Sequence, residues 1–248
     1  MKQSRGRARI GMLVPFTNSN LEPDFALMAP PGVSCHSARM GGYDEDEVPD
    51  EAQMQGLGAA DIEGPLALLL GIKPDVVVYG CTSATLTHGP EFDRALAQRI
   101  AAASGAKTVT AAGALVHGLT HLGVRRIGFA SPYVAAINAM AVQFLADMGF
   151  ECVRQAAVDA ALGNHEQGAL TPEDVYALGL RADCAAAEAI VLSCTEMRSV
   201  ETLDRLEQKL GKPVVSSNQA MMFQALGALG IHDPVVGFGS LLEKDGRA

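Results

Sequence analysis

The stretch Val76-Val-Val-Tyr-Gly-Cys81-Thr82 is a run of apolar residues that ends in a cysteine followed by a hydroxyl-bearing residue. A second stretch, Ala189-Ile-Val-Leu-Ser-Cys194-Thr195, has the same pattern. Short continuous apolar runs rich in β-branched residues predict strands that are buried on both faces of a parallel sheet. The two stretches therefore predict two equivalent buried strands, each followed at once by a cysteine.

A second shared motif lies ahead of each stretch. The triplet Arg-Ile-Gly centred on Ile10 lies 71 positions before Cys81, and the same triplet centred on Ile127 lies 67 positions before Cys194. A proline follows each triplet at the same distance. This agreement in order and spacing indicates duplication of one α/β unit, in which each half carries a strand that ends at a cysteine.

Apolar runs and Ala/Leu-rich segments alternate along the rest of the chain. Strands joined by helices in this way predict right-handed βαβ units and hence parallel sheets. We expect further strands at 9–14, 33–38, 107–111, 126–130, 150–154 and 213–216. We expect helices at 61–71, 90–104, 113–122, 134–148, 172–186, 200–210 and 218–230.

The fold class expected from these features is α/β, with two pseudo-symmetric lobes that each hold a parallel sheet flanked by helices. Residues 1–114 would form the first lobe and residues 115–215 the second, with the segment 216–248 packing back on the first. In open α/β sheets, ligands bind beyond the carboxyl ends of the strands. The site is therefore expected in the cleft between the lobes, where the two cysteine-bearing strand ends meet.

Cys81 and Cys194 fall at this position in the two halves. Thr82, Ser83 and Thr195 follow them, and such turns present backbone N–H groups and hydroxyls that suit a carboxylate. A free thiol has a pKa of roughly 8.5, and a helix start is expected to lower it so that the thiolate can form. A thiolate can attack carbon or remove a proton, while the opposite thiol delivers one. We therefore expect an enzyme that acts on a small carboxylate through this pair.

Composition narrows the classes of partner. The 248 residues carry a formal net charge of −9, with 48% hydrophobic and 19% charged residues, which is typical of a folded protein. No Lys/Arg cluster is visible beyond the short segment Lys2 to Arg9, so nucleic acid is not expected as a partner. No apolar run approaches the ~20 residues of a membrane helix, and the start lacks the apolar region of a signal peptide. We expect no membrane contact and a cytoplasmic location.

The remaining cysteines and histidines have simpler interpretations. Cys35, Cys152 and Cys184 show neither a Cys-x-x-Cys spacing nor a paired position, so we expect free thiols that serve packing. His117 and His121 lie one helical turn apart, but no third metal ligand accompanies them. No glycine-rich phosphate-binding motif follows a strand. We expect neither a metal nor a cofactor.

Five motifs carry a resemblance to a known family. They are Val14-Pro-Phe-Thr-Asn18-Ser-Asn-Leu-Glu22-Pro, Tyr79-Gly-Cys81-Thr-Ser-Ala-Thr85, Ser131-Pro-Tyr133, Gly163-Asn164 and Leu192-Ser-Cys194-Thr-Glu-Met197. Over nearly the whole chain, the sequence resembles the branch of the aspartate/glutamate racemase superfamily that contains maleate cis–trans isomerases and arylmalonate decarboxylases. The resemblance implies two flavodoxin-like lobes, a cofactor-independent reaction and a homo-oligomer, either a dimer or a tetramer.

The same resemblance implies roles within the site. In maleate isomerases the first cysteine attacks the double bond and the second handles the proton, which implies these roles for Cys81 and Cys194. It also implies that Asn18, Tyr133 and Asn164 bind the substrate carboxylates, together with the turns after the two cysteines. Members with both cysteines are isomerases or racemases, whereas arylmalonate decarboxylases have glycine at the first position. Maleate-to-fumarate isomerisation is therefore the favoured activity, and decarboxylation is disfavoured.

Three alternatives stay open from the sequence. A two-base racemase of aspartate, glutamate or a hydantoin would use the same cysteine pair, with Glu22, Asp24 or Glu196 as a counter-charge for an ammonium group. A second alternative is a member of the same branch that is encoded with ectoine breakdown pathways. Phe16 stands where the isomerases commonly have serine, and its bulk leaves the substrate open. A non-enzymatic dicarboxylate-binding protein would need the anion-binding turns but not the paired thiols.

Overall fold

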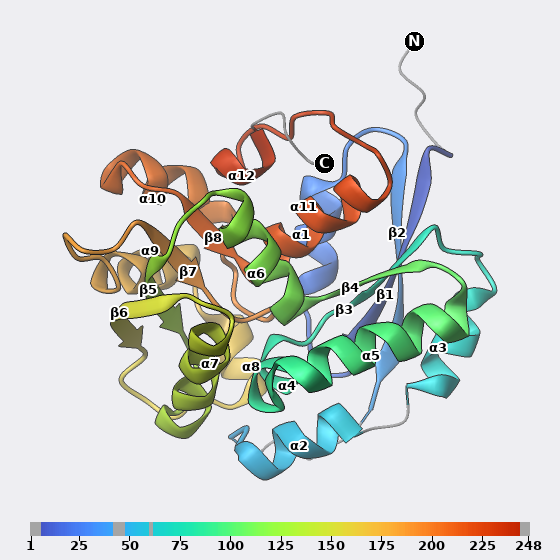
Figure 1. Cartoon of the computed structure of the whole chain (residues 1–248), viewed down its shortest axis with the longest axis horizontal. Coiled ribbons are helices and arrows are strands. Elements are labelled where there is room, and N and C mark those ends of the chain that lie inside the picture. The colour runs from blue at the N-terminus through green and yellow to red at the C-terminus, as the bar shows by residue number, and fades with distance from the viewer. Residues whose placement is uncertain (1–5, 42–47, 60–61, 244–248) are drawn as a thin grey trace.

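Two α/β lobes make up the chain in the computed structural model, which describes residues 6–41, 48–59 and 62–243 (Figure 1). Each lobe holds one four-stranded sheet in which all strands are parallel. The strand order is β2-β1-β3-β4 in the first sheet and β6-β5-β7-β8 in the second. One topology therefore occurs twice along the chain, and the predicted α/β class with two similar parallel sheets is confirmed.

The strands lie where the sequence predicted them, including the one expected at 33–38. The first sheet consists of β1 (Ala8–Pro15), β2 (Val33–Met40), β3 (Val76–Tyr79) and β4 (Lys107–Thr110). The second consists of β5 (Arg126–Ser131), β6 (Glu151–Ala157), β7 (Ala189–Leu192) and β8 (Val214–Ser216). The carboxyl ends of β3 and β7 lead directly to the two cysteines.

Helices cover both sheets. In the first half they are α1 (Leu21–Met28), α2 (Glu51–Ala59), α3 (Glu63–Leu70), α4 (Thr82–Thr87), α5 (Gly89–Ser104) and α6 (Ala111–His121). In the second half they are α7 (Ala135–Asp147), α8 (Asn164–Ala169), α9 (Pro172–Arg181), the 3₁₀ turn η1 (Val200–Thr202), α10 (Leu203–Leu210), α11 (Ser217–Ala228) and α12 (Ser240–Glu243). The sequence did not predict α1, α2, α4, α8 or α12, and the helix expected at 172–186 ends at Arg181.

Helix α1 begins in spite of a proline near its start. Pro23 lies in the first turn, where a helix leaves its backbone N–H groups without internal partners, so the missing N–H costs little. The Asn18 side chain supplies the start signal, because its Oδ1 accepts from the N–H groups of Asn20 at 3.2 Å and Leu21 at 2.9 Å. The helix therefore depends on a residue outside its own apolar pattern, which explains why the sequence did not predict it.

Close helix packing explains the glycine in each Arg-Ile-Gly triplet. Gly128 lies in β5, and a Cβ there would come within 2.1 Å of the Ala182 carbonyl oxygen and 2.8 Å of Ile190 Cδ1. Gly11 holds the same position in β1, where a Cβ would come within 2.9 Å of Leu69 in α3. The central strand of each sheet therefore has no room for a larger side chain at this position.

Two equivalent helices lie against each other where the lobes meet. Helix α6 follows β4, α11 follows β8, and the two pack together (Figure 1). Thr110 and Ser216 cap them by accepting from the N–H groups of Gly113 and Gln219, both at 3.2 Å. Helix α11 also contacts α1 and β4 of the first lobe. The segment after β8 thus touches the first lobe, while the boundaries at 114 and 215 stay a prediction.

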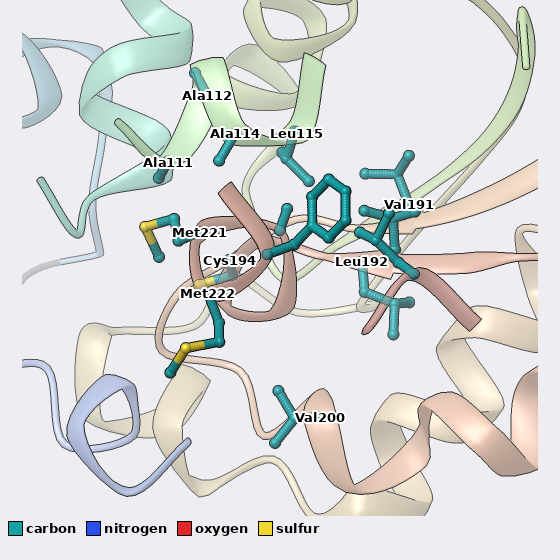
Figure 2. Packing of buried hydrophobic residues seen from close by; sticks show 14 of the residues in the cluster. Ala111, Ala112, Ala114, Leu115, Val191, Leu192, Cys194, Val200, Met221 and Met222 are labelled. Atoms are coloured by element: carbon teal, nitrogen blue, oxygen red, sulfur yellow. The ribbon is translucent and has the colours of Figure 1, made fainter. Parts of the chain in front are cut away.

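The main apolar core extends through both lobes. Figure 2 shows part of it, in which Ala111 and Leu115 of α6, Met221 and Met222 of α11, and Cys194 belong to one cluster of buried residues. Cys194 therefore belongs to the same core as the buried side chains of α6 and α11. Within the described ranges, no helix is long and apolar enough to cross a membrane.

Replacing Gly128 by alanine should destabilise the fold. The added Cβ would overlap a backbone oxygen that cannot rotate away, so we expect the G128A substitution to lower the free energy of unfolding by about 3 kcal/mol. The G41A substitution is the matched control, because no atom lies within 4 Å of a Cβ at Gly41. Urea denaturation should therefore separate the two variants, and equal stability would contradict the packing described for β5.

Candidate active site

A pocket lies between the two lobes and takes its walls from both. It is lined by residues that include both strand-end cysteines, several polar side chains and four apolar ones: Pro15, Thr17, Asn18, Pro49, Met54, Cys81, Ser83, Tyr133, Ile137, Asn164, Gln167, Cys194, Thr195 and Glu196. Each sheet thus delivers one thiol to the same cavity. The polar groups can hold a small carboxylate, and the apolar ones exclude water from it.

Cys81 is fixed by the turn between β3 and α4. It is 5% exposed, and the backbone N–H groups of Ser83 and Ala84 are directed at its sulfur. The Ser83 hydroxyl lies 3.7 Å from Cys81 Sγ. N–H and O–H groups placed in this way stabilise a negative charge on sulfur more than they stabilise the neutral thiol. The turn is therefore prepared for a thiolate at Cys81.

Cys194 occupies the equivalent position after β7. It is also 5% exposed, and the backbone N–H groups of Glu196 and Met197 are directed at its sulfur. Gln167 Oε1 lies 3.7 Å from Cys194 Sγ and accepts from the thiol. The two sulfurs thus share one local geometry, in which the second and third residues after each cysteine supply the donors.

Burial governs the resting state of both thiols. It raises the pKa of the Cys81 thiol above its usual value and that of the Cys194 thiol to about 12, and the neighbouring N–H groups oppose this only in part. The sequence predicted the opposite direction, a pKa lowered by the helix start, and that prediction is wrong. A sulfur with almost no contact with water loses more hydration than a few N–H groups return. Both cysteines therefore rest as neutral thiols.

One hydroxyl connects the two cysteine turns. Thr195 Oγ1 donates to the Gly80 carbonyl oxygen at 3.1 Å and accepts from Asn18 Nδ2 at 3.1 Å. Gly80 precedes Cys81, and Thr195 follows Cys194. The bond therefore joins the strand end of one lobe to the turn of the other, and it fixes the spacing of the two sulfurs.

Tyr133 is held over the pocket by a buried polar pair. Ser131 Oγ accepts from the Tyr133 N–H at 3.2 Å and donates to Asn138 Oδ1 at 2.5 Å. Asn138 Nδ2 in turn donates to the Tyr133 carbonyl oxygen at 2.9 Å. Burial holds the pKa of the Tyr133 hydroxyl well above its usual value, and the nearby Cys194 and Cys81 act in the same direction. The hydroxyl therefore stays protonated and can donate a hydrogen bond into the site.

Glu196 binds across the lobe boundary. Its carboxyl group accepts from the Ser19 N–H at 2.9 Å and from Ser19 Oγ at 2.8 Å. Asn20 Nδ2 donates to the Glu196 carbonyl at 2.6 Å and to the Gly168 carbonyl at 3.0 Å. Burial raises the pKa of the Glu196 carboxyl to about 7, against the effect of the Ser19 donors. The loop that carries Asn18 is thus anchored to the turn that carries Cys194.

Asp24 and Glu22 lie outside the pocket wall. Asn218 Nδ2 donates to Asp24 Oδ2 at 2.7 Å and to the Thr195 carbonyl at 3.0 Å, so Asp24 supports the Cys194 turn from behind. Burial raises the pKa of Asp24 to about 7. Glu22 pairs with Arg39, which also donates to the Asn18 carbonyl. Of the three carboxyl groups considered as a counter-charge, only Glu196 lines the pocket.

The structure brings together seven of the eight site residues expected from the sequence. Asn18, Cys81, Ser83, Tyr133, Asn164, Cys194 and Thr195 all line the pocket. Thr82 differs, because it begins α4 with its side chain 1% exposed and is not part of the wall. A direct contact between Thr82 and substrate therefore stays a prediction that the pocket wall does not support.

Several wall residues were missed in the sequence. Gln167 lies three positions after Asn164 in α8, so the helical period brings both to one face, a signal that could have been used. Thr17 adjoins Asn18 in the first motif. Met54 comes from α2, in a segment where no periodic pattern predicted a helix. Its place at the pocket follows from tertiary packing alone.

The other thiols and histidines have packing roles, as expected. Cys35, Cys152 and Cys184 are partly buried against the main core. The rings of His117 and His121 both lie against Phe223. In the part of the chain that the structure describes, no group of three His, Cys, Asp or Glu side chains could hold a metal ion.

Fold and pocket together define a two-lobed α/β protein with a paired-cysteine site. The chain belongs to the arylmalonate decarboxylase family, whose family model matches residues 10–242. The resemblance identified from the sequence motifs is thereby confirmed.

Individual relatives include both activities of this branch. A maleate isomerase of Nocardia farcinica is 30% identical over 97% of this chain and 97% of its own. An arylmalonate decarboxylase of Bordetella bronchiseptica is 29% identical over 88% of this chain and 86% of its own. A solved structure of a Nocardia farcinica maleate cis–trans isomerase mutant, with a covalently bound succinylcysteine intermediate, is 26% identical with a TM-score of 0.87. The structural match includes 96% of this chain and 99% of the Nocardia farcinica chain.

The raised pKa values predict slow alkylation of the pocket thiols. At pH 7 we expect iodoacetamide to modify Cys81 and Cys194 far more slowly in the folded protein than in the protein unfolded by urea. In the folded protein, the rate of modification should still increase above pH 9. Mass spectrometry of the labelled peptides over a pH series measures this. A rate that levels off near pH 8.5 would mean that the folded protein leaves these thiols unperturbed.

Proposed function

We propose that this protein is a cofactor-independent isomerase of a small dicarboxylate, and that it converts maleate into fumarate. The carrying observation is the pair of buried thiols, one from each lobe, at a single pocket lined by carboxylate-binding side chains. Relatives named as maleate isomerases and the succinylcysteine intermediate of the Nocardia farcinica mutant support this proposal. A binding protein would need the polar wall but not a thiol in each lobe.

The first step adds the Cys81 thiol across the double bond. Cys81 sulfur bonds to one alkene carbon, and the π-electron pair moves to the other carbon and its carboxylate, which becomes an enediolate. The N–H groups of Ser83 and Ala84 stabilise the sulfur as its proton leaves. Cys194 gives its proton to the charged carbon and takes up the proton that Cys81 releases, so that atoms and charges balance.

Rotation and elimination complete the reaction. The former double bond is now single, so the two halves of the succinyl adduct can rotate about it. Elimination is the reverse of the addition. The Cys194 sulfur takes the proton from the carbon next to the thioether and passes its own proton to the Cys81 sulfur as the carbon–sulfur bond breaks. Fumarate leaves and both thiols are restored. The Tyr133 hydroxyl can donate a hydrogen bond to the enediolate charge that develops during both the addition and the elimination.

The surroundings of the two sulfurs differ in a way that supports separate roles. The Ser83 hydroxyl favours a thiolate at Cys81. Burial raises the pKa of Cys194 most, the Glu196 carboxyl raises it further, and the Tyr133 hydroxyl lowers it. Cys194 thus lies among groups that hold and exchange protons, which suits a proton carrier, and Cys81 has no carboxyl group among the groups that shift its pKa, which suits the nucleophile.

Polar side chains at both ends of the pocket suit two carboxylates. We assign them to substrate binding, together with Tyr133: Thr17, Asn18, Ser83, Asn164, Gln167 and Thr195. Met54 and Ile137 add apolar wall and exclude water from the adduct. A homo-oligomer and a cytoplasmic location stay predictions of the sequence.

Loss of the Cys81 sulfur should abolish turnover without affecting the fold. We expect C81S to lower kcat for maleate by at least about a thousandfold, since a hydroxyl at neutral pH is a far weaker nucleophile. The C152S variant is the matched control, because Cys152 is partly buried outside the pocket and should keep full activity. Near-normal turnover in C81S would exclude the covalent mechanism.

Replacing Cys194 by serine should trap the adduct. The C194S variant keeps the nucleophile, and its hydroxyl can still deliver a proton but takes one back far more slowly than a thiol, so the protein should gain the mass of one maleic acid on the Cys81 peptide after mixing with maleate. The C81S variant should gain none. An adduct on Cys194 in the wild type would reverse the assigned roles.

Proton NMR in deuterated water separates isomerisation from racemisation. Wild-type protein should convert maleate into fumarate and leave the α-hydrogen of aspartate and glutamate unexchanged. Exchange at the α-carbon of an amino acid, without action on maleate, would replace the isomerase by a two-base racemase.

A further inference from the structure

Glu196 is the only carboxyl group in the described pocket wall, and that wall has no cation to balance it. Among the lining residues that the structure describes, none is lysine, arginine or histidine. A dicarboxylate brings two negative charges into this space. If Glu196 were also charged, three negative groups would meet in a site that contains little water. The charge of Glu196 therefore decides how well such a substrate binds.

The Glu196 side chain is held so that it cannot turn away. Its Oε1 accepts from Ser19 Oγ at 2.8 Å, and Oε2 accepts from the Ser19 N–H at 2.9 Å. On the other side it lies against α8, where a Cβ on Gly168 would come within 2.3 Å of Oε1. Glycine at position 168 leaves the space that the carboxyl group fills. The residue is 6% exposed, so water cannot screen its charge effectively.

We propose that Glu196 takes up a proton when a dicarboxylate dianion binds, and that the enzyme holds its substrate only beside the neutral carboxyl group. This inference rests on the proposed action on a dicarboxylate. Protonation removes one of the three like charges. Burial already brings the pKa of Glu196 to about 7 in the empty site, so little free energy separates the two forms near neutral pH.

The charged groups around Glu196 act in both directions. His165 of α8 and Arg39 of β2 favour the charged form, although both lie outside the pocket wall. Asp24 of α1 repels Glu196, as their mutual effect shows. Cys194 precedes it by two residues and rests as a neutral thiol. A bound dianion would add a second repulsion, from within the pocket that Glu196 lines.

The expected result is a Michaelis constant that depends on pH above neutrality. The wild-type KM for maleate should be flat below pH 7 and rise about tenfold per pH unit between pH 7.5 and 9, because only the protonated form binds. No other group of the site or the substrate should titrate in this pH range. The substrate carboxyl groups are already ionised below it, and burial raises the pKa of both thiols above their usual value. The E196Q variant should bind maleate with a KM that no longer changes over this range.

A neighbouring residue provides the matched control. His165 is exposed next to Glu196, so the H165N variant should keep the rise in KM if Glu196 is responsible. An unchanged pH dependence in E196Q would overturn the inference, and so would a wild-type KM that is flat to pH 9. Tighter binding of maleate at high pH would also overturn it, because a charged Glu196 should repel the dianion.

Calorimetry tests the same inference without turnover. In the C81S background at pH 8, binding of maleate should take up close to one proton, measured in two buffers of different ionisation enthalpy. The C81S/E196Q double variant should take up none. Maleate turnover without proton uptake would contradict this inference alone. If maleate is not turned over, uptake on binding of fumarate or succinate still decides the role of Glu196, so the two failures can be told apart.

Discussion

The hydrogen bond from Thr195 Oγ1 to the Gly80 carbonyl joins the two halves of the site. Each sheet brings its own cysteine to the carboxyl end of a central strand, and the two sheets are separate. Thr195 ties these two strand ends together, because it follows one cysteine and binds the residue before the other. Asn18 then ties the same hydroxyl to the loop before α1. A reaction that passes a carbon centre between two thiols requires this spacing to be fixed.

Behind this contact, the molecule combines a dry interior with a small number of directed donors. Burial makes both thiols neutral, while two backbone N–H groups at each sulfur favour the charged form once a proton leaves. The same balance applies to the Tyr133 hydroxyl. The two thiols and this hydroxyl therefore keep their protons in the resting state and exchange them only when substrate arrives. Charge is created where donors already point, which lowers the cost of reorganisation during the reaction.

The sequence predicted the repeat, the strands and the cysteine pair, because these rest on local patterns: apolar runs, a glycine in each Arg-Ile-Gly triplet, and a cysteine at each strand end. The resemblance added Asn18, Tyr133 and Asn164, which all line the pocket. What the sequence could not predict depends on tertiary contacts. Met54 reaches the site through the packing of α2, and the direction of the thiol pKa shifts follows from burial that only the assembled lobes create.

The two turns differ at the second and third residues after each cysteine, and the polar difference lies at the second. That second residue is Ser83 in the first half and Glu196 in the second. Both supply a backbone N–H to the sulfur before them, so the skeleton of the site is twofold, and only the side chains break its symmetry. A duplicated ancestor with identical halves would have had two interchangeable thiols and no preferred direction of attack. Divergence of these side chains gives the pair a polarity, with the Ser83 hydroxyl beside the Cys81 sulfur and the Glu196 carboxyl near the Cys194 sulfur.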